Sequence, residues 1–139
     1  MSLRGWTSAF SLAVAFATTA IEVGIGQTTN SRIEVTEASK LVYEGIKKHN
    51  AGASIHAISN PYDQDFLYFQ ATWPNPVGSP VIGNFAVNPR TGDVWNAAGC
   101  ERLTSRSLKS AQEGIRKRFH IAKAEYDKLH AKTPLCGKD

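Results

Sequence analysis

Apolar residues first recur at helical spacing between Thr36 and Gly52. The stripe they form consists of Ala38, Leu41, Val42 and Ile46. Spacings of three and four residues place such a stripe on one face of an amphipathic helix. Thr36 is a good N-cap and Gly52 a good helix stop, so the pattern predicts a helix between them. Gly45 lies inside it at a cost of about 1 kcal/mol relative to alanine, which indicates close packing against another segment.

The hydrophobic period then changes to that of strands. Four short runs are rich in aromatic or β-branched residues, and they cover 54–59, 65–73, 81–88 and 93–97. In the sequence NPRTGD at 88–93, proline sets φ and glycine accepts a positive φ, which is typical of a tight turn. A phosphate-binding loop would need several glycines that lead into a helix, whereas one glycine precedes a strand here. The pattern predicts four antiparallel strands in meander order.

A second apolar stripe runs through residues 107–132. Its members recur at spacings of three and four, and they are Leu108, Ala111, Ile115, Phe119, Ala122, Tyr126 and Leu129. This spacing predicts one long C-terminal helix that packs on the sheet. The alternative is a homodimer through the stripe, which is close to a heptad pattern. The predicted fold class is α+β, with an N-terminal helix, a four-stranded antiparallel meander sheet and a long C-terminal helix.

The N-terminus has the pattern of an export signal. Arg4 precedes an uncharged run from Gly5 to Ile21, and the apolar centre of this run is short for a membrane span. Small residues allow cleavage after Ala20 or after Gly26. We therefore predict a signal peptide at 1–26, a single α+β domain at 27–139 and a periplasmic or secreted location, with no membrane span after processing. An uncleaved anchor or a buried helix is the alternative.

The two cysteines of the chain, Cys100 and Cys136, both follow the predicted signal. In an oxidising compartment such a pair forms a disulfide, which would stabilise the fold by about 3–4 kcal/mol through loop entropy. A catalytic thiol is the alternative. Neither cysteine lies in a C-x-x-C or a glycine-flanked nucleophile pattern, which favours the disulfide.

Charge is distributed unevenly along the chain, whose net charge is +4. From Arg102 onward, ten Lys or Arg face four Asp or Glu, whereas residues 32–101 hold five basic and seven acidic residues. A basic tail in general favours nucleic acid, but an exported domain rarely meets one. We expect an acidic protein or an anionic envelope surface as the counterpart.

The residues that carry chemistry are few. Four histidines lie on three predicted elements without metal-ligand spacing, so neither a metal nor a cofactor is expected. Asp63 and Asp65 in the sequence YDQD have the composition of an acid–base pair, and a small envelope hydrolase that uses them is one alternative function. A DxD in a loop is more often turn chemistry. We expect no catalytic residues and predict that the protein is not an enzyme.

Aromatic residues near strand ends are the stronger functional signal. Trp and Tyr at such positions, beside proline and polar residues, are typical anchors for a protein partner. The predicted partner-binding set is Tyr62, Asp63, Asp65, Trp73, Arg90 and Trp95. The alternative for the aromatic members is that they cover the open end of the sheet as core residues.

The stretch FAVNPRTGDVWN at 85–96 resembles the closing hairpin of small exported PepSY domains. The order of helix, strands, hairpin and helix also resembles the cystatin-like and nuclear-transport-factor-like folds of some bacterial immunity proteins. The long C-terminal helix and the cysteine pair depart from a minimal PepSY unit. The resemblance implies binding or inhibition rather than catalysis, and no family active-site residue carries over. It predicts an exported inhibitor or immunity protein, monomeric or homodimeric, that acts on an envelope enzyme or toxin.

Overall fold

The computed structural model describes residues 31–75 and 77–136, so the predicted signal peptide lies outside the described residues. Within these ranges the elements follow the order α1 (Val35–Ile46), β1 (Ser54–Ile58), β2 (Leu67–Thr72), β3 (Val81–Val87), β4 (Val94–Asn96), β5 (Glu101–Arg102), α2 (Arg106–Arg118) and α3 (Lys123–His130). No helix in this part of the chain is long and apolar enough to cross a membrane.

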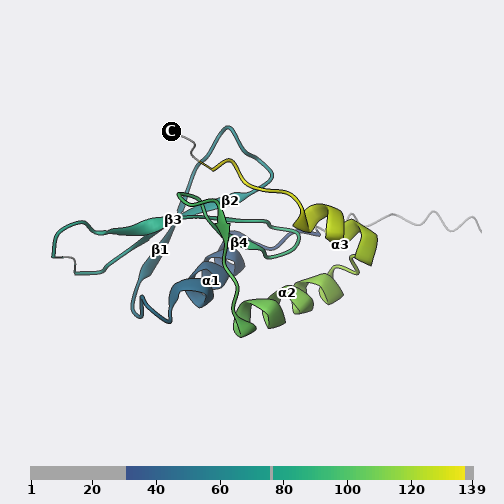
Figure 1. The fold of residues 1–139 in the computed structure, drawn as a ribbon, viewed down its shortest axis with the longest axis horizontal. Helices are drawn as coiled ribbons and strands as arrows, with labels where there is room; N and C mark the ends of the chain where they lie inside the picture. The colour runs from purple at the N-terminus through teal and green to yellow at the C-terminus, as the bar shows by residue number, and fades with distance from the viewer. Residues whose placement is uncertain (1–30, 76, 137–139) are drawn as a thin grey trace, which may run out of the picture.

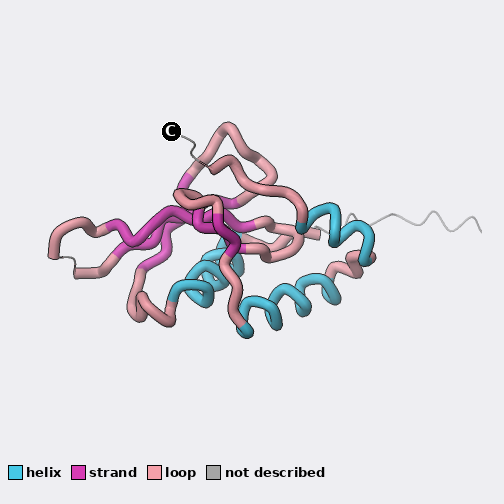
Figure 2. Tube along the Cα trace, in the orientation of Figure 1, coloured by secondary structure: helices cyan, strands magenta, loops and turns pink. Residues whose placement is uncertain are grey.

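The strands form one antiparallel sheet in the order β1-β2-β3-β4-β5 (Figure 1). The meander of four strands is confirmed. The prediction missed β5, which pairs with β4 through two residues only. Two residues cannot display a period of two, so this strand exists through its pairing and has no pattern of its own. Figure 2 shows the long loops that separate β1 from β2 and β2 from β3.

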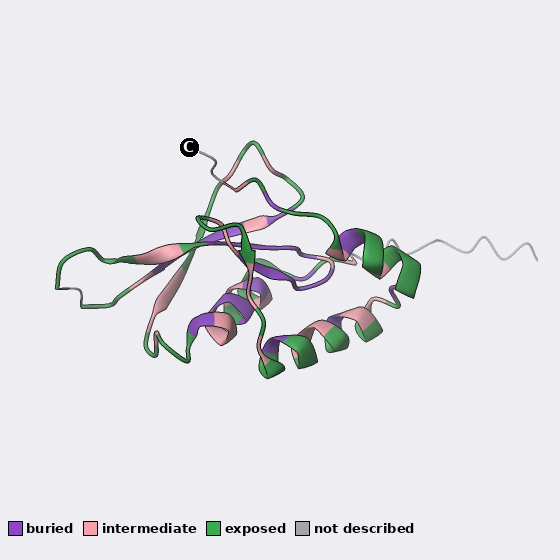
Figure 3. Cartoon of the chain, in the orientation of Figure 1, coloured by how far each residue is buried: buried purple, intermediate pink, exposed green. Residues whose placement is uncertain are grey.

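Helix α1 covers one face of the sheet. Its four buried residues are those of the predicted stripe, and they meet core residues from three strands, namely Phe69, Ala71, Phe85, Val87 and Val94. Figure 3 shows this contact as the buried part of the molecule. The helix begins one residue before Thr36, after Glu34, whose side chain makes no capping hydrogen bond, so the predicted N-cap is wrong. It also ends before Gly52, which has a φ of +87° in the turn that follows.

The predicted close packing at Gly45 is confirmed. A Cβ at this position would lie 2.9 Å from Cδ1 of Leu103 and 3.4 Å from Cδ1 of Leu108. Both leucines belong to the segment that leads into α2 or to its first turn. The missing side chain therefore allows α2 to pack beside α1.

The prediction of one long C-terminal helix is wrong, because the chain turns between α2 and α3. Phe119 ends α2, and His120 follows with a φ of +51°. The His120 amide donates to the Lys117 carbonyl at 3.2 Å, and the Ile121 amide donates to the Arg116 carbonyl at 3.1 Å. This pair of bonds is the Schellman motif, in which glycine usually takes the left-handed position. Histidine occupies it here, so the sequence carries no visible stop signal.

The break redirects the apolar stripe into two contacts. Leu108 and Ile115 of α2 join the core beside α1, whereas Leu129 of α3 is buried against the β3–β4 turn, where Asn88 Nδ2 donates to its carbonyl at 3.2 Å. Leu108, Ile115 and Leu129 are thus buried within one chain, whereas Phe119 and Tyr126 are half-buried. The homodimer alternative needed the stripe uncovered, and no continuous exposed stripe exists in the described residues.

The predicted disulfide is confirmed. It joins Cys100, in the turn between β4 and β5, to Cys136, after α3, and the two Cα atoms are 5.4 Å apart. The bond fastens the chain that follows α3 to the far edge of the sheet.

Candidate partner-binding site

The loop between β1 and β2 holds three residues of the predicted partner-binding set. The side chains of Asn60 and Asp63 shape it, because each accepts a hydrogen bond at 3.1 Å from the backbone amide two residues on, that of Tyr62 or of Asp65. Such Asx turns form from local sequence alone. They leave Tyr62 with 86% of its surface exposed.

Asp63 ties this loop to the C-terminal segment. Its Oδ2 accepts a hydrogen bond from the Tyr68 hydroxyl at 2.6 Å and another from the Leu135 amide at 3.1 Å. Its Oδ1 accepts the Asp65 amide, so both carboxylate oxygens are engaged within the chain. The bond to the Asp65 amide is the turn chemistry that the sequence offered as the alternative to an acid–base pair.

The Tyr68 hydroxyl gives the fold a dependence on alkaline pH. Burial raises the pKa of Tyr68, and its hydrogen bond to the Asp63 carboxylate raises the pKa further. Because the folded-state pKa lies above the unfolded value of about 10, the stability that this group contributes is fully present below pH 10 and is lost as the pH rises further. We expect the free energy of unfolding of the wild type to fall more steeply above about pH 10 than that of Tyr68→Phe.

Urea unfolding at a series of pH values checks this expectation, and Tyr62→Phe is the matched control because Tyr62 is exposed. The control should follow the wild-type curve. If the Tyr68→Phe and wild-type curves run parallel at alkaline pH, the phenol does not carry the dependence.

Asp65 and Arg90, both in the predicted set, line one cavity of about 110 Å³. The other lining residues are Arg32, Asn88, Pro89, Leu129 and Lys132. Asp65 forms an ion pair with Lys132 at 2.9 Å, and this hydrogen bond lowers the pKa of Asp65. We call the cavity formed by these seven lining residues the cationic cavity. Sequence reasoning missed Arg32 and Lys132, because nothing in the spacing of residues 32, 65, 90 and 132 shows that they meet.

The two tryptophans of the predicted set lie in different surroundings. Trp73 follows β2, at the opposite end of this strand from the loop that holds Tyr62, and is 38% exposed. Trp95 is 7% exposed and packs with Phe66, Tyr68 and Ala86. The Arg102 guanidinium lies over its ring at 4.5 Å from the centroid. Trp95 therefore has the surroundings of a core residue, as in the alternative interpretation.

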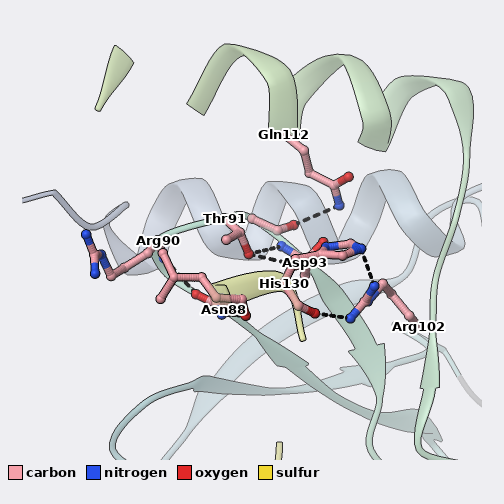
Figure 4. A network of polar contacts seen from close by, with 9 residues as sticks. Asn88, Arg90, Thr91, Asp93, Arg102, Gln112 and His130 are labelled. Carbon is pink, nitrogen blue, oxygen red and sulfur yellow. Dashed lines mark hydrogen bonds and ion pairs between the residues drawn. The ribbon is translucent and has the colours of Figure 1, made fainter. Parts of the chain in front are cut away.

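A buried polar network at the β3–β4 turn went unnoticed in the sequence. The predicted turn at 88–93 is confirmed, but it is covered by the helices, and Asp93 is only 1% exposed. Asp93 Oδ2 accepts a hydrogen bond from the Thr91 hydroxyl at 2.8 Å and contacts His130 Nδ1 at 2.8 Å (Figure 4). A carboxylate can be buried only if it has hydrogen-bonding or charged partners. The burial of Asp93 therefore explains why Thr91 and His130 lie against it.

Arg102 completes this network from β5. Its guanidinium contacts His130 Nε2 and also donates to the His130 backbone carbonyl (Figure 4). An aspartate that orients a histidine is a common part of general-base sites. Here the second ring nitrogen, which would take a proton from a substrate, faces Arg102 instead. The contacts of His130 with Asp93 and Arg102 hold α3 against the β3–β4 turn and β5. Gln112, on α2, donates to the Gly92 carbonyl of the same turn at 3.3 Å.

Metal-ligating side chains do not gather in the part of the chain that the structure describes. No group of three or more His, Cys, Asp or Glu residues there is placed to hold a metal ion.

The fold is similar to that of one chain in a solved type VI secretion system effector–immunity complex from Pseudomonas protegens. The TM-score is 0.58 at 20% sequence identity, and the similarity covers 72% of this chain and 88% of that chain. No protein-family model and no curated protein matches the sequence. The finer resemblances to PepSY and cystatin-like domains stay predictions. The likeness places the chain among α+β folds of which one member occurs in an effector–immunity complex.

Proposed function

We propose that the protein is an exported, non-enzymatic binding module that inhibits another protein, as an immunity protein does toward a toxin or an envelope enzyme. The observation that carries the proposal is the fold shared with a chain of an effector–immunity complex. The Cys100–Cys136 disulfide supports export, because such bonds persist in oxidising compartments. The predicted signal peptide at 1–26 points to the same periplasmic or secreted location.

The loop between β1 and β2 is the surface that we propose for the partner. Tyr62 projects from it, and exposed aromatic side chains on a rigid frame are typical anchors of protein interfaces. The hydrogen bonds of Asp63 hold the loop against the C-terminal segment, so little order has to be gained on binding. The cationic cavity lies beside the same loop, since Asp65 belongs to both.

The described polar groups support binding rather than catalysis. The hydrolase alternative would use Asp63 and Asp65, whose carboxylates are engaged with the Tyr68 hydroxyl, the C-terminal backbone and Lys132. The other oriented pair, Asp93 and His130, has Arg102 at its outer nitrogen. A general base needs a free acceptor within hydrogen-bond reach of its substrate. Asp63 has both carboxylate oxygens engaged, and the outer nitrogen of His130 faces Arg102, which disfavours both residues as general bases.

The proposal is tested by capturing the partner and measuring what becomes of its activity. The full chain is exported with a C-terminal affinity tag and incubated with envelope extract. The captured protein is identified, purified and titrated with wild type and with Tyr62→Ala. We expect a complex with one copy of each chain, loss of the captured enzyme's activity in proportion to complex formed, and affinity about tenfold or more weaker for Tyr62→Ala.

Val77→Ala is the control, because Val77 is also an exposed apolar residue but lies in the loop between β2 and β3. It should bind like the wild type. A captured protein whose activity does not change on saturation contradicts the inhibitory role. A hydrolytic activity of this chain that disappears in Asp63→Asn would establish the enzyme alternative instead.

A further inference from the structure

The cationic cavity draws its charged walls from four separate segments. Arg32 precedes α1, Asp65 lies in the loop before β2, Arg90 belongs to the β3–β4 turn, and Lys132 follows α3. Leu129, Pro89 and the buried Asn88 form the rest of its lining. Figure 4 shows Arg90 and Asn88 side by side at the turn.

Positive charge exceeds negative charge in this lining. Three cations face one carboxylate, Asp65, so the lining has a formal charge of +2. Arg90 also forms an ion pair with Glu125, outside the lining, which leaves +1 when Glu125 is counted. Among the described residues Arg32 has no carboxylate within ion-pair distance, and it donates to the Gln64 carbonyl at 3.2 Å. The cavity therefore retains attraction for one further negative charge.

Donor groups in the walls are incompletely used. Nε of Arg90 is buried without a hydrogen-bond partner in the part of the chain described. The base of the cavity is held firmly, because Asn88 Oδ1 accepts the Arg90 amide at 3.0 Å and Asn88 Nδ2 donates to the Leu129 carbonyl at 3.2 Å. A rigid base and spare guanidinium donors are the features that bind planar oxyanions well.

We propose that the cationic cavity receives the carboxylate of an aspartate or glutamate side chain on the partner protein, an inference that rests on the proposed function. A singly charged carboxylate matches the excess of +1 to +2. A phosphate dianion would bring its second charge close to Asp65 and Glu125, which disfavours it. Tyr62, three residues before Asp65 in the same loop, is exposed and supplies an aromatic contact. The partner epitope is therefore an acidic side chain beside an apolar surface.

The carboxylate preference is tested without the partner. Arg Nε–Hε resonances of the full chain are followed by NMR during titration with the capped tripeptide acetyl-Gly-Glu-Gly-amide, with its Gln analogue and with inorganic phosphate. We expect saturable shifts at Arg32 and Arg90 with the Glu peptide only. Arg32→Gln should weaken this binding by up to about fivefold, the effect of losing one partly exposed ion pair, whereas Arg106→Gln, an exposed arginine outside the cavity, should not.

Three results would overturn the proposal. They are equal shifts with the Gln peptide, equal weakening by Arg106→Gln, and saturation by phosphate where the Glu peptide has no effect. Lys132→Gln is a second cavity variant, and thermal unfolding checks that every variant is folded.

The captured complex then separates this proposal from the proposed function. A complex that forms with wild type and is equally tight with Arg32→Gln and Lys132→Gln overturns the cavity inference and leaves the inhibitory function standing. Weaker binding by both cavity variants, with wild-type affinity for the control Arg106→Gln, supports the cavity inference. If no complex forms with wild type, the proposed function fails, and the assignment of the carboxylate to a partner protein fails with it.

Discussion

Gly92→Ala is expected to lower the free energy of unfolding by about 2–5 kcal/mol. Gly92 has a φ of +74°, which an L-residue adopts at a cost. A Cβ there would lie 2.6 Å from Cδ1 of Ile115 and 3.2 Å from Cδ1 of Leu41. Both neighbours are buried core residues, so neither has free space into which to move. Equilibrium urea unfolding measures the effect.

Gly52→Ala is the matched control, because Gly52 also has a positive φ, +87°, but nothing lies within 4 Å of its added Cβ. It should cost only the backbone contribution, about 1–2 kcal/mol. The difference between the two variants is the contribution of close packing between the β3–β4 turn and the helices. Equal effects at both positions would show that the turn is not packed as described.

Replacing both Cys100 and Cys136 with serine is expected to lower the free energy of unfolding by about 3–4 kcal/mol. The bond closes a loop across a sequence separation of 36 residues, and its loss allows the unfolded chain more conformations. The remaining polar ties of the C-terminal segment include the hydrogen bonds of Leu135 with Asp63 and with the Tyr68 hydroxyl, and the exposed Asp65–Lys132 ion pair. Urea unfolding of the variant and of the wild type checks the value.

Reductant provides the control for this second effect. Dithiothreitol should bring the wild type to the stability of the double serine variant and leave the variant itself unchanged. A wild type whose stability does not respond to reductant under unfolding conditions would contradict the contribution assigned to the bond.

The elements that sequence reasoning found are those whose signal is local. The stripe of α1 and the alternation of the strands repeat within a few residues, and the turn at 88–93 carries its own proline and glycine. The disulfide could be predicted because the chain has only two cysteines, which allow a single pairing. Each of these features depends on residues that are close in the chain or, for the disulfide, on the single pairing that two cysteines allow.

The long C-terminal helix was predicted wrongly for a physical reason that can be stated. Both α2 and α3 have helical spacing, and the residue in the left-handed position between them is His120 rather than glycine. The turn is stabilised because it lets Leu129 reach the β3–β4 turn and His130 reach Asp93. Those contacts span about 40 residues, so no window of neighbouring sequence contains them.

By itself the sequence determined the α+β class, α1, the meander of β1–β4, the tight turn and the cysteine pair, because local periodicity and turn chemistry act between neighbours. Only the tertiary structure decided that Trp95 is buried, that Asp93 needs His130 and Thr91 as partners, and that Arg32, Arg90 and Lys132 surround one cavity. Burial and charge balance are properties of side chains brought together from distant segments. They take effect only after the helices have packed on the sheet.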